Sequence, residues 1–131
     1  MEVTIGTRNF RSTKMDPFKQ FHVLRRMGSL FPSLAGAIRV EDKMLAAGYI
    51  MAALSRLADD DANFIINSCL ATCKIQQGSL WADVIDGSGN LMFQDMQLPD
   101  IMELVWKVLK DNYAPFMKDL LSKVSGLGVK A

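Results

Sequence analysis

The sequence predicts a mainly α-helical fold, arranged as a single compact domain of about five helices over residues 1–131 with a minor β-hairpin or loop element. Three observations lead to this expectation. Apolar residues recur every three or four positions in several segments, which is the spacing of a helix with one buried face. Several of these segments begin with a capping residue and end at a glycine. The 131 residues, half of them hydrophobic, suffice for one core, and no repeat or linker divides them.

The N-terminal segment from Val3 to Ser12 alternates weakly between apolar and polar side chains and contains a glycine and an asparagine that suit a turn. This pattern is typical either of a short strand or hairpin, or of a flexible arm over residues 1–14. The two alternatives stay open at the level of the sequence.

Three helices are expected next. Asp16 is a good N-cap and Pro17 suits the first helical position, so the first helix runs from there to Gly28. A short second helix is expected at residues 32–38. The third, from Lys43 to Ala58, has apolar residues on one face.

Three consecutive acids, Asp59–Asp61, open the fourth helix. A metal site is one interpretation of this run, but carboxylates at a helix N-terminus also cap free N–H groups and complement the helix dipole, which is the commoner case. An apolar stripe follows, and the helix is expected to end near Gln77–Gly78. Cys69 and Cys73 lie on that stripe and are expected to be ordinary core thiols.

A small hairpin or paired loop is expected between residues 80–85 and 91–93, because two apolar runs flank a glycine-rich turn. The clearest helix then begins at Leu98 and continues to Tyr113, with apolar residues at helical spacing and Trp106 off the main stripe. Ala114–Pro115 is expected to begin a separate last helix.

The C-terminus is expected to be a mobile tail over residues 125–131. The N-terminus is polar and does not resemble a signal peptide, and no apolar run approaches the length of a membrane span. With only two cysteines, the chain fits a reducing compartment, and we expect it in the cytoplasm.

The motifs of enzymes and metal proteins are missing. The formal net charge is +1 and the one histidine, His22, has no partner at catalytic or zinc-ligand spacing. The turn at residues 86–90 begins like a calcium loop, but Leu91 stands where a glycine is needed and Gln97 where a glutamate is needed. The basic residues of the N-terminal fifth lack an aromatic platform. We therefore expect no catalytic activity, no cofactor, no metal, no nucleic acid and no membrane partner.

Methionine is frequent, with 9 residues of 131. Its flexible, polarizable side chain fills irregular cores and also recurs on surfaces that accept apolar partners of varied shape. Together with a mean hydropathy of +0.12, this favours an exposed apolar binding surface. The apolar surplus is also compatible with self-association into a small oligomer.

The stretch from Lys14 to Arg26, followed by Phe31–Pro32, resembles the opening of small proteins encoded in the tail gene clusters of long-tailed bacteriophages and prophages. Residues 54–73, 78–96 and 101–113 are similar as well. These relatives are tail assembly chaperones.

The resemblance implies a mainly helical protein that acts in the cytoplasm of the bacterial host and is absent from the mature virion. Such chaperones bind the long tape-measure protein, keep its hydrophobic helices soluble and help tail-tube subunits polymerise around it. The alternatives are a structural component of the virion, such as a head–tail connector or another tail component, and a small regulator that binds a host protein.

A chaperone for amphipathic helices needs an adaptable apolar surface rather than an active site. The residues that we expect to form this surface are large apolar side chains from the first helix, the segment after it and the hairpin region: Met15, Phe18, Phe21, Leu30, Phe31, Met92, Phe93 and Met96. For each of them, packing in the core is the alternative.

Overall fold

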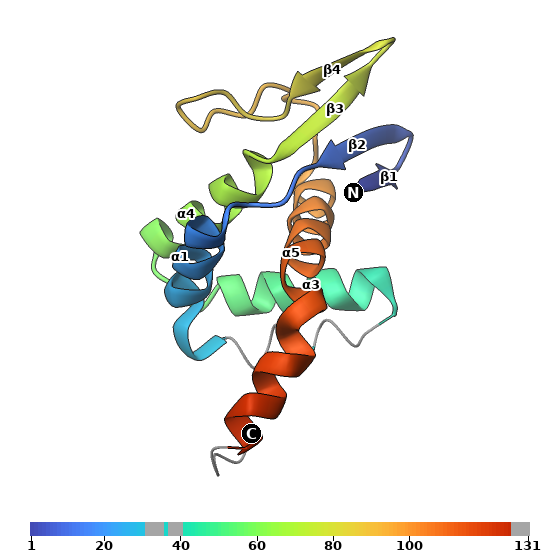
Figure 1. Ribbon diagram of the computed structural model, residues 1–131. Helices are drawn as coiled ribbons and strands as arrows, with labels where there is room; N and C mark the ends of the chain where they lie inside the picture. The colour runs from blue at the N-terminus through green and yellow to red at the C-terminus, as the bar shows by residue number, and fades with distance from the viewer. Residues whose placement is uncertain (31–35, 37–40, 127–131) are drawn as a thin grey trace.

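The computed structural model describes residues 1–30, 36 and 41–126, which fold into four α-helices, a short 3-10 turn and a four-stranded antiparallel sheet (Figure 1). The domain is therefore mixed α/β, and the expectation of a mainly α fold with about five helices is wrong. The helices are α1 (Pro17–Met27), α3 (Lys43–Leu54), α4 (Asp59–Leu70) and α5 (Leu98–Gly126), and the 3-10 turn is Gly28–Leu30. The helix expected at 32–38 falls, except for residue 36, outside the described residues.

The sheet joins two hairpins that lie far apart in the sequence. Its strands are β1 (Glu2–Ile5), β2 (Arg8–Ser12), β3 (Cys73–Gln77) and β4 (Leu80–Asp83), in that spatial order and all antiparallel. Phe10 of β2 lies opposite Ile75 of β3, and both side chains are buried. Because side chains alternate along a strand, one face of the sheet packs on the core, and the other is polar except for Trp81, which Arg11 covers. The N-terminal segment therefore takes the hairpin form of its two alternatives.

The second hairpin corrects two expectations. The helix expected to reach Gln77–Gly78 ends at Leu70, and the chain then enters β3. Gly78 is the turn between β3 and β4, where its φ of 61° suits glycine. The hairpin expected between residues 80–85 and 91–93 is reduced to a single bridge between Ile85 and Leu91.

The starts of α1 and α4 differ in how they are capped. The Asp16 carboxylate accepts a hydrogen bond of 3.0 Å from the Lys19 backbone N–H, which confirms Asp16 as the N-cap of α1. In α4 the three acids lie in the first turn after Ala58, and no side chain caps the helix. Their charge complements the helix dipole. Asp61 also forms an ion pair with Arg26 of α1 at 3.1 Å, which links the two helices.

The last segment forms one continuous helix of 29 residues, α5, and not two helices separated at Ala114–Pro115. A proline inside a helix lacks the N–H that would bond the carbonyl four residues earlier, which here is that of Asp111. The ammonium group of Lys14 lies 2.5 Å from this carbonyl oxygen and supplies a donor in place of the missing one. Met117, just after the proline, is still buried in the core, and the helix then extends away from the rest of the domain (Figure 1).

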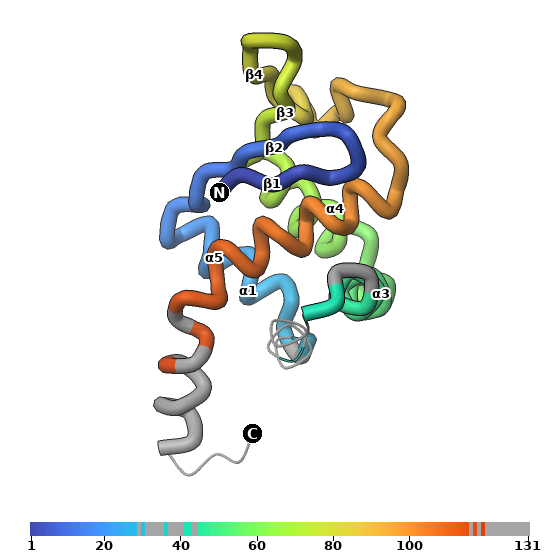
Figure 2. Tube along the Cα trace, turned by 90° about the vertical axis from the view of Figure 1, so that its right-hand side faces the viewer, coloured from blue at the N-terminus to red at the C-terminus, as the bar shows by residue number. Residues whose placement is uncertain are grey.

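The core is organised around the first half of α5. This helix packs against α3, α4 and β1 (Figure 2), so it is covered on several sides. Trp106, expected off the main apolar stripe, is for this reason buried with an exposed fraction of 1%. In the described part of the chain, no helix combines the length and the apolar character that crossing a membrane requires.

Candidate partner-binding surfaces

The candidate contact residues fall into an exposed group and a core group. Phe18, Phe21 and Met92 are exposed, with fractions of 79%, 59% and 54%. The others divide as follows: Met15, Leu30 and Met96 are buried, Phe93 packs half-buried against the core, and Phe31 lies outside the described residues. The buried members follow the core-packing alternative, so the exposed group is the one accessible to a partner.

Two exposed phenylalanines share one face of α1. Phe18 and Phe21 lie three positions apart, which places their side chains on neighbouring turns of the same face. The ring of His22 contacts that of Phe21 edge to face, with the centroids 5.4 Å apart. The opposite face of α1 is buried through Val23 and Met27. α1 thus packs by one face and presents an aromatic face to solvent.

The charge of α1 is wholly positive, since the helix contains Lys19, Arg25 and Arg26 but no acidic residue. Lys19 and Arg26 lie over the ring of Phe64 on α4, at 5.2 Å and 4.4 Å from its centroid. These two cations therefore face α4. Arg25 is exposed and lies four positions after Phe21, so it borders the aromatic face with positive charge.

A buried asparagine holds the start of α1 against α5. Asn112 Oδ1 accepts hydrogen bonds from the backbone N–H of Met15 at 2.9 Å and from Gln20 Nε2 at 3.1 Å, while its amide group donates to the Val108 carbonyl at 2.8 Å. The Tyr113 hydroxyl donates to the Gln20 carbonyl at 2.8 Å. This network fixes the orientation of α1, and it explains why Met15 belongs to the core.

The second group of candidates surrounds the segment before α5. The guanidinium group of Arg8 in β2 forms a bidentate ion pair with the Asp95 carboxylate, with N–O distances of 2.6 Å and 3.1 Å. Its central carbon lies 5.9 Å from the centroid of the Phe93 ring. Met96 of the same segment is buried. Of the candidate contact residues in this region, Met92 is the exposed one.

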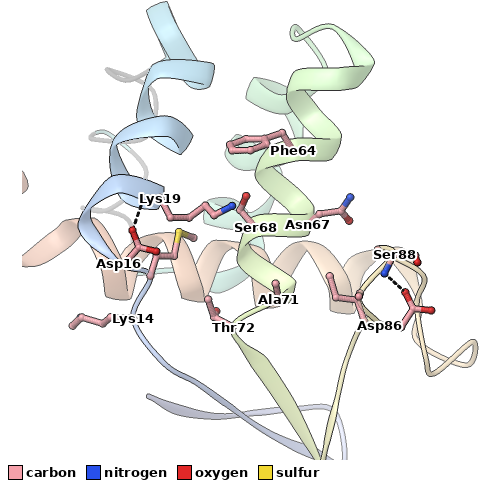
Figure 3. Close-up of a pocket in the computed structure, with 14 residues that line it drawn as sticks. Lys14, Asp16, Lys19, Phe64, Asn67, Ser68, Ala71, Thr72, Asp86 and Ser88 are labelled. Atoms are coloured by element: carbon pink, nitrogen blue, oxygen red, sulfur yellow. Dashed lines mark hydrogen bonds between the residues drawn. The ribbon is translucent and has the colours of Figure 1, made fainter.

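A cleft of about 600 Å³ lies between the start of α1, the second half of α4 and the loop at residues 85–89. Figure 3 shows Lys19 reaching from α1 toward α4, with Phe64 above it and Asp86 on the far wall. The lining is mixed in polarity and contains no histidine or cysteine. Its charged lining residues are Lys14, Asp16, Lys19 and Asp86.

The carboxylate of Asp86 is satisfied by its own loop. It accepts hydrogen bonds from the backbone N–H groups of Ser88 and Asn90, at 2.8 Å and 2.9 Å, and from the Asn90 side chain at 3.2 Å. These bonds, the Asn90 backbone first, lower the pKa of Asp86. Among the described residues, no three metal-ligating side chains of the His, Cys, Asp or Glu type stand together. The loop is thus a hydrogen-bonded turn.

The two cysteines are buried and unbonded to each other. Burial raises the pKa of Cys73 to about 11 and also raises that of Cys69. Both thiols therefore stay protonated near neutral pH, and they behave as core residues.

One apolar surface escaped the sequence reasoning. Leu45 and Tyr49 of α3 are exposed, although Ile50 and Leu54 on the opposite side of the helix are buried; Met51, between the two sides, is exposed as well. The signal that could have revealed this surface is the near absence of polar residues in α3. A helix that is apolar on all sides but buried on one must expose apolar residues on the other.

Comparison with known proteins gives one match. A family model described as "Phage tail assembly chaperone protein, TAC" matches residues 6–128, which is nearly the whole chain. No curated protein and no solved structure matches.

Proposed function

The chain belongs to the family of phage tail assembly chaperones, and we propose that it binds the tape-measure protein, keeps the hydrophobic helices of that protein soluble and assists tail-tube polymerisation. Membership of the family implies interaction with other phage tail proteins. In this proposal the chain acts as a binding protein without catalysis, in the cytoplasm of the infected host, and leaves before the virion is complete.

The observation that carries the proposal is the aromatic face of α1. Two phenylalanine side chains with exposed fractions of 79% and 59% are costly to leave in water, because each large apolar side chain gains about 1.5–3 kcal/mol when it is buried. An amphipathic helix that lays its apolar stripe across Phe18 and Phe21 recovers this free energy. The partner's own stripe is covered in the same step, so it can no longer aggregate.

The charge around this face selects among helices. Arg25 gives the aromatic face a positive border, and the helix contains no acidic residue to offset it. A segment with acidic residues beside its apolar stripe complements this border, whereas a basic segment is repelled. We therefore expect the tape-measure segments that bind to be amphipathic and locally acidic.

Co-expression tests the proposal. A tape-measure protein, taken from the surrounding genes where these form a tail gene cluster, is expressed alone, with the wild-type chain and with the variant Phe18→Ser/Phe21→Ser. Soluble yield and co-purification are measured in each case. We expect the wild-type chain to raise the soluble yield and to co-purify, and the variant to do neither.

The matched control is Leu80→Ser/Leu98→Ser, which removes two side chains of similar exposure, 71% and 57%, from other parts of the molecule. This control should behave like the wild-type chain. A wild-type chain that neither solubilises nor binds the tape-measure protein contradicts the proposed function. Finding the chain in purified virions instead supports a structural role in the tail.

A further inference from the structure

The outer face of α3 is an apolar stripe formed by Leu45, Gly48, Tyr49 and Ala52, which recur at the spacing of one helix face. Leu45 and Tyr49 have exposed fractions of 54% and 51%. Gly48 leaves an open space between them, because a Cβ at this position would meet nothing within 4 Å. Figure 2 views α3 nearly along its axis and shows it at the edge of the domain, with the body of the molecule on one side.

This stripe differs from the aromatic face of α1 in its charge. After Lys43 at its first position, α3 contains no charged residue. Helices that are apolar all round are normally buried on all sides. The stripe therefore resembles the apolar core of a stable interface between subunits, and it lacks the charged border of the α1 face.

We propose that the partner of this face is a second copy of the same chain, with the two α3 helices packed antiparallel about a two-fold axis between Gly48 and Tyr49. In this arrangement, Leu45 of each copy lies opposite Ala52 of the other. Each Tyr49 ring lies over Gly48 of the other copy, where no side chain obstructs it. The stripe is thus self-complementary, with a large residue facing a small one at every level.

The charges at the ends of α3 favour the same arrangement. Glu41 precedes the helix and Arg56 follows it, both are exposed, and neither forms an ion pair with another described residue of its own chain. Antiparallel pairing brings Glu41 of each copy to Arg56 of the other and opposes the two helix dipoles. Parallel pairing would instead place like charges together. The Asp42 carboxylate bonds within its own chain, where it accepts a hydrogen bond of 3.1 Å from the Leu45 backbone N–H.

This inference does not depend on the proposed function, because its test measures only the mass of the particle that the purified chain forms in solution. Sedimentation and light scattering of the full chain at micromolar to hundred-micromolar concentration should give twice the chain mass of 14.6 kDa. Tyr49→Glu should give the single-chain mass with unchanged circular dichroism. Leu80→Glu is the matched control, because it places the same charge at an exposed apolar residue elsewhere, and it should leave the dimer intact.

A charge exchange tests the orientation without disturbing the apolar stripe. Glu41→Arg and Arg56→Glu should each raise the dimer Kd about tenfold, because each places two like-charge pairs in the interface. The double variant restores both pairs with reversed signs and should return the Kd to near its wild-type value.

A single-chain mass at every concentration overturns the inference. So does a dimer that Tyr49→Glu leaves intact, or a double variant that does not recover. If Tyr49→Glu leaves the mass unchanged but abolishes tape-measure binding, the α3 face serves that partner and the dimer proposal fails, while the proposed function stands.

Discussion

Asn112 shows at the scale of a single residue how the α1 face is held in place. Its side chain is 1% exposed and satisfies two donors from the segment before and within α1. A buried amide is tolerated only when its groups are bonded, and losing one partner leaves the others unsatisfied. The orientation of Phe18 and Phe21 therefore depends on a polar residue that never meets the partner.

Replacing this residue tests that dependence. Asn112→Ala removes three hydrogen bonds and leaves the Met15 N–H without an acceptor inside the protein. We expect the free energy of unfolding to fall by about 2–4 kcal/mol in urea titrations. Asn63→Ala, at an exposed position of α4, is the control and should change it by less than about 0.5 kcal/mol. Equal effects of the two variants would contradict the role given to Asn112.

Asp86 gives a residue-scale prediction that depends on pH. Its pKa is lowered in the folded state by N–H groups of its own loop, so its ionised form stabilises the fold. This contribution is present at pH values above the unfolded-state pKa of about 3.9 and is lost as the pH falls through the lowered pKa. We expect the Tm of Asp86→Asn to lie below that of the wild-type chain at pH 7, and the difference to shrink at pH 2.5. A difference that is the same at both pH values would refute this account of the loop.

At the scale of an element, α5 shows how a residue distant in the sequence can supply the hydrogen-bond donor that a proline removes from a helix. Pro115 leaves the Asp111 carbonyl without its usual donor, and Lys14 approaches that oxygen from the segment before α1. The same ammonium group lies 3.5 Å from the Asp111 carboxylate. The helix continues through the proline because part of what it loses is supplied from elsewhere in the fold.

A double-mutant cycle tests this compensation. Pro115→Ala restores the backbone donor and should raise the free energy of unfolding by about 1–2 kcal/mol, after allowance for the greater freedom of the unfolded chain. Lys14→Met should lower it by less than about 1 kcal/mol, because Lys14 is half-exposed. In the Pro115→Ala background this loss should shrink. Strictly additive effects would show that the two residues act independently.

The elements also show which parts of the fold local sequence can predict. α1 was predictable because its cap and its end are set by neighbouring residues, Asp16 and Gly28. β3 was not, because its position depends on pairing with β2, whose Phe10 lies opposite Ile75 although about half of the chain separates them in sequence. Local periodicity cannot reveal such a partner, so a short strand after α4 resembles the continuation of that helix.

The candidate surface was predictable in part for the same reason. Phe18 and Phe21 were correctly placed on a helix, since local signals define α1. Local sequence does not say whether a methionine is covered, so Met15 and Met96 could not be told apart from Met92 before the fold was known. The α3 face was missed because a helix without a polar side gives no periodic signal.

At the scale of the whole molecule, two apolar surfaces differ in character. The α1 face is aromatic with a positive border, and the α3 face is neutral. In the proposed dimer, pairing through α3 leaves both α1 faces available to a partner. A long helical protein with repeated apolar stripes can then engage both faces, and the second contact gains from the raised effective concentration.

The most direct test of the central claim is site-specific photo-crosslinking in cells that also express the tape-measure protein. A photoreactive phenylalanine analogue replaces Phe18 in one variant and Leu80 in another, both strongly exposed positions. Mass spectrometry then identifies the crosslinked partner. We predict an adduct with the tape-measure protein from position 18 and none from position 80. No adduct from position 18, or equal adducts from both positions, would contradict the assignment of the α1 face.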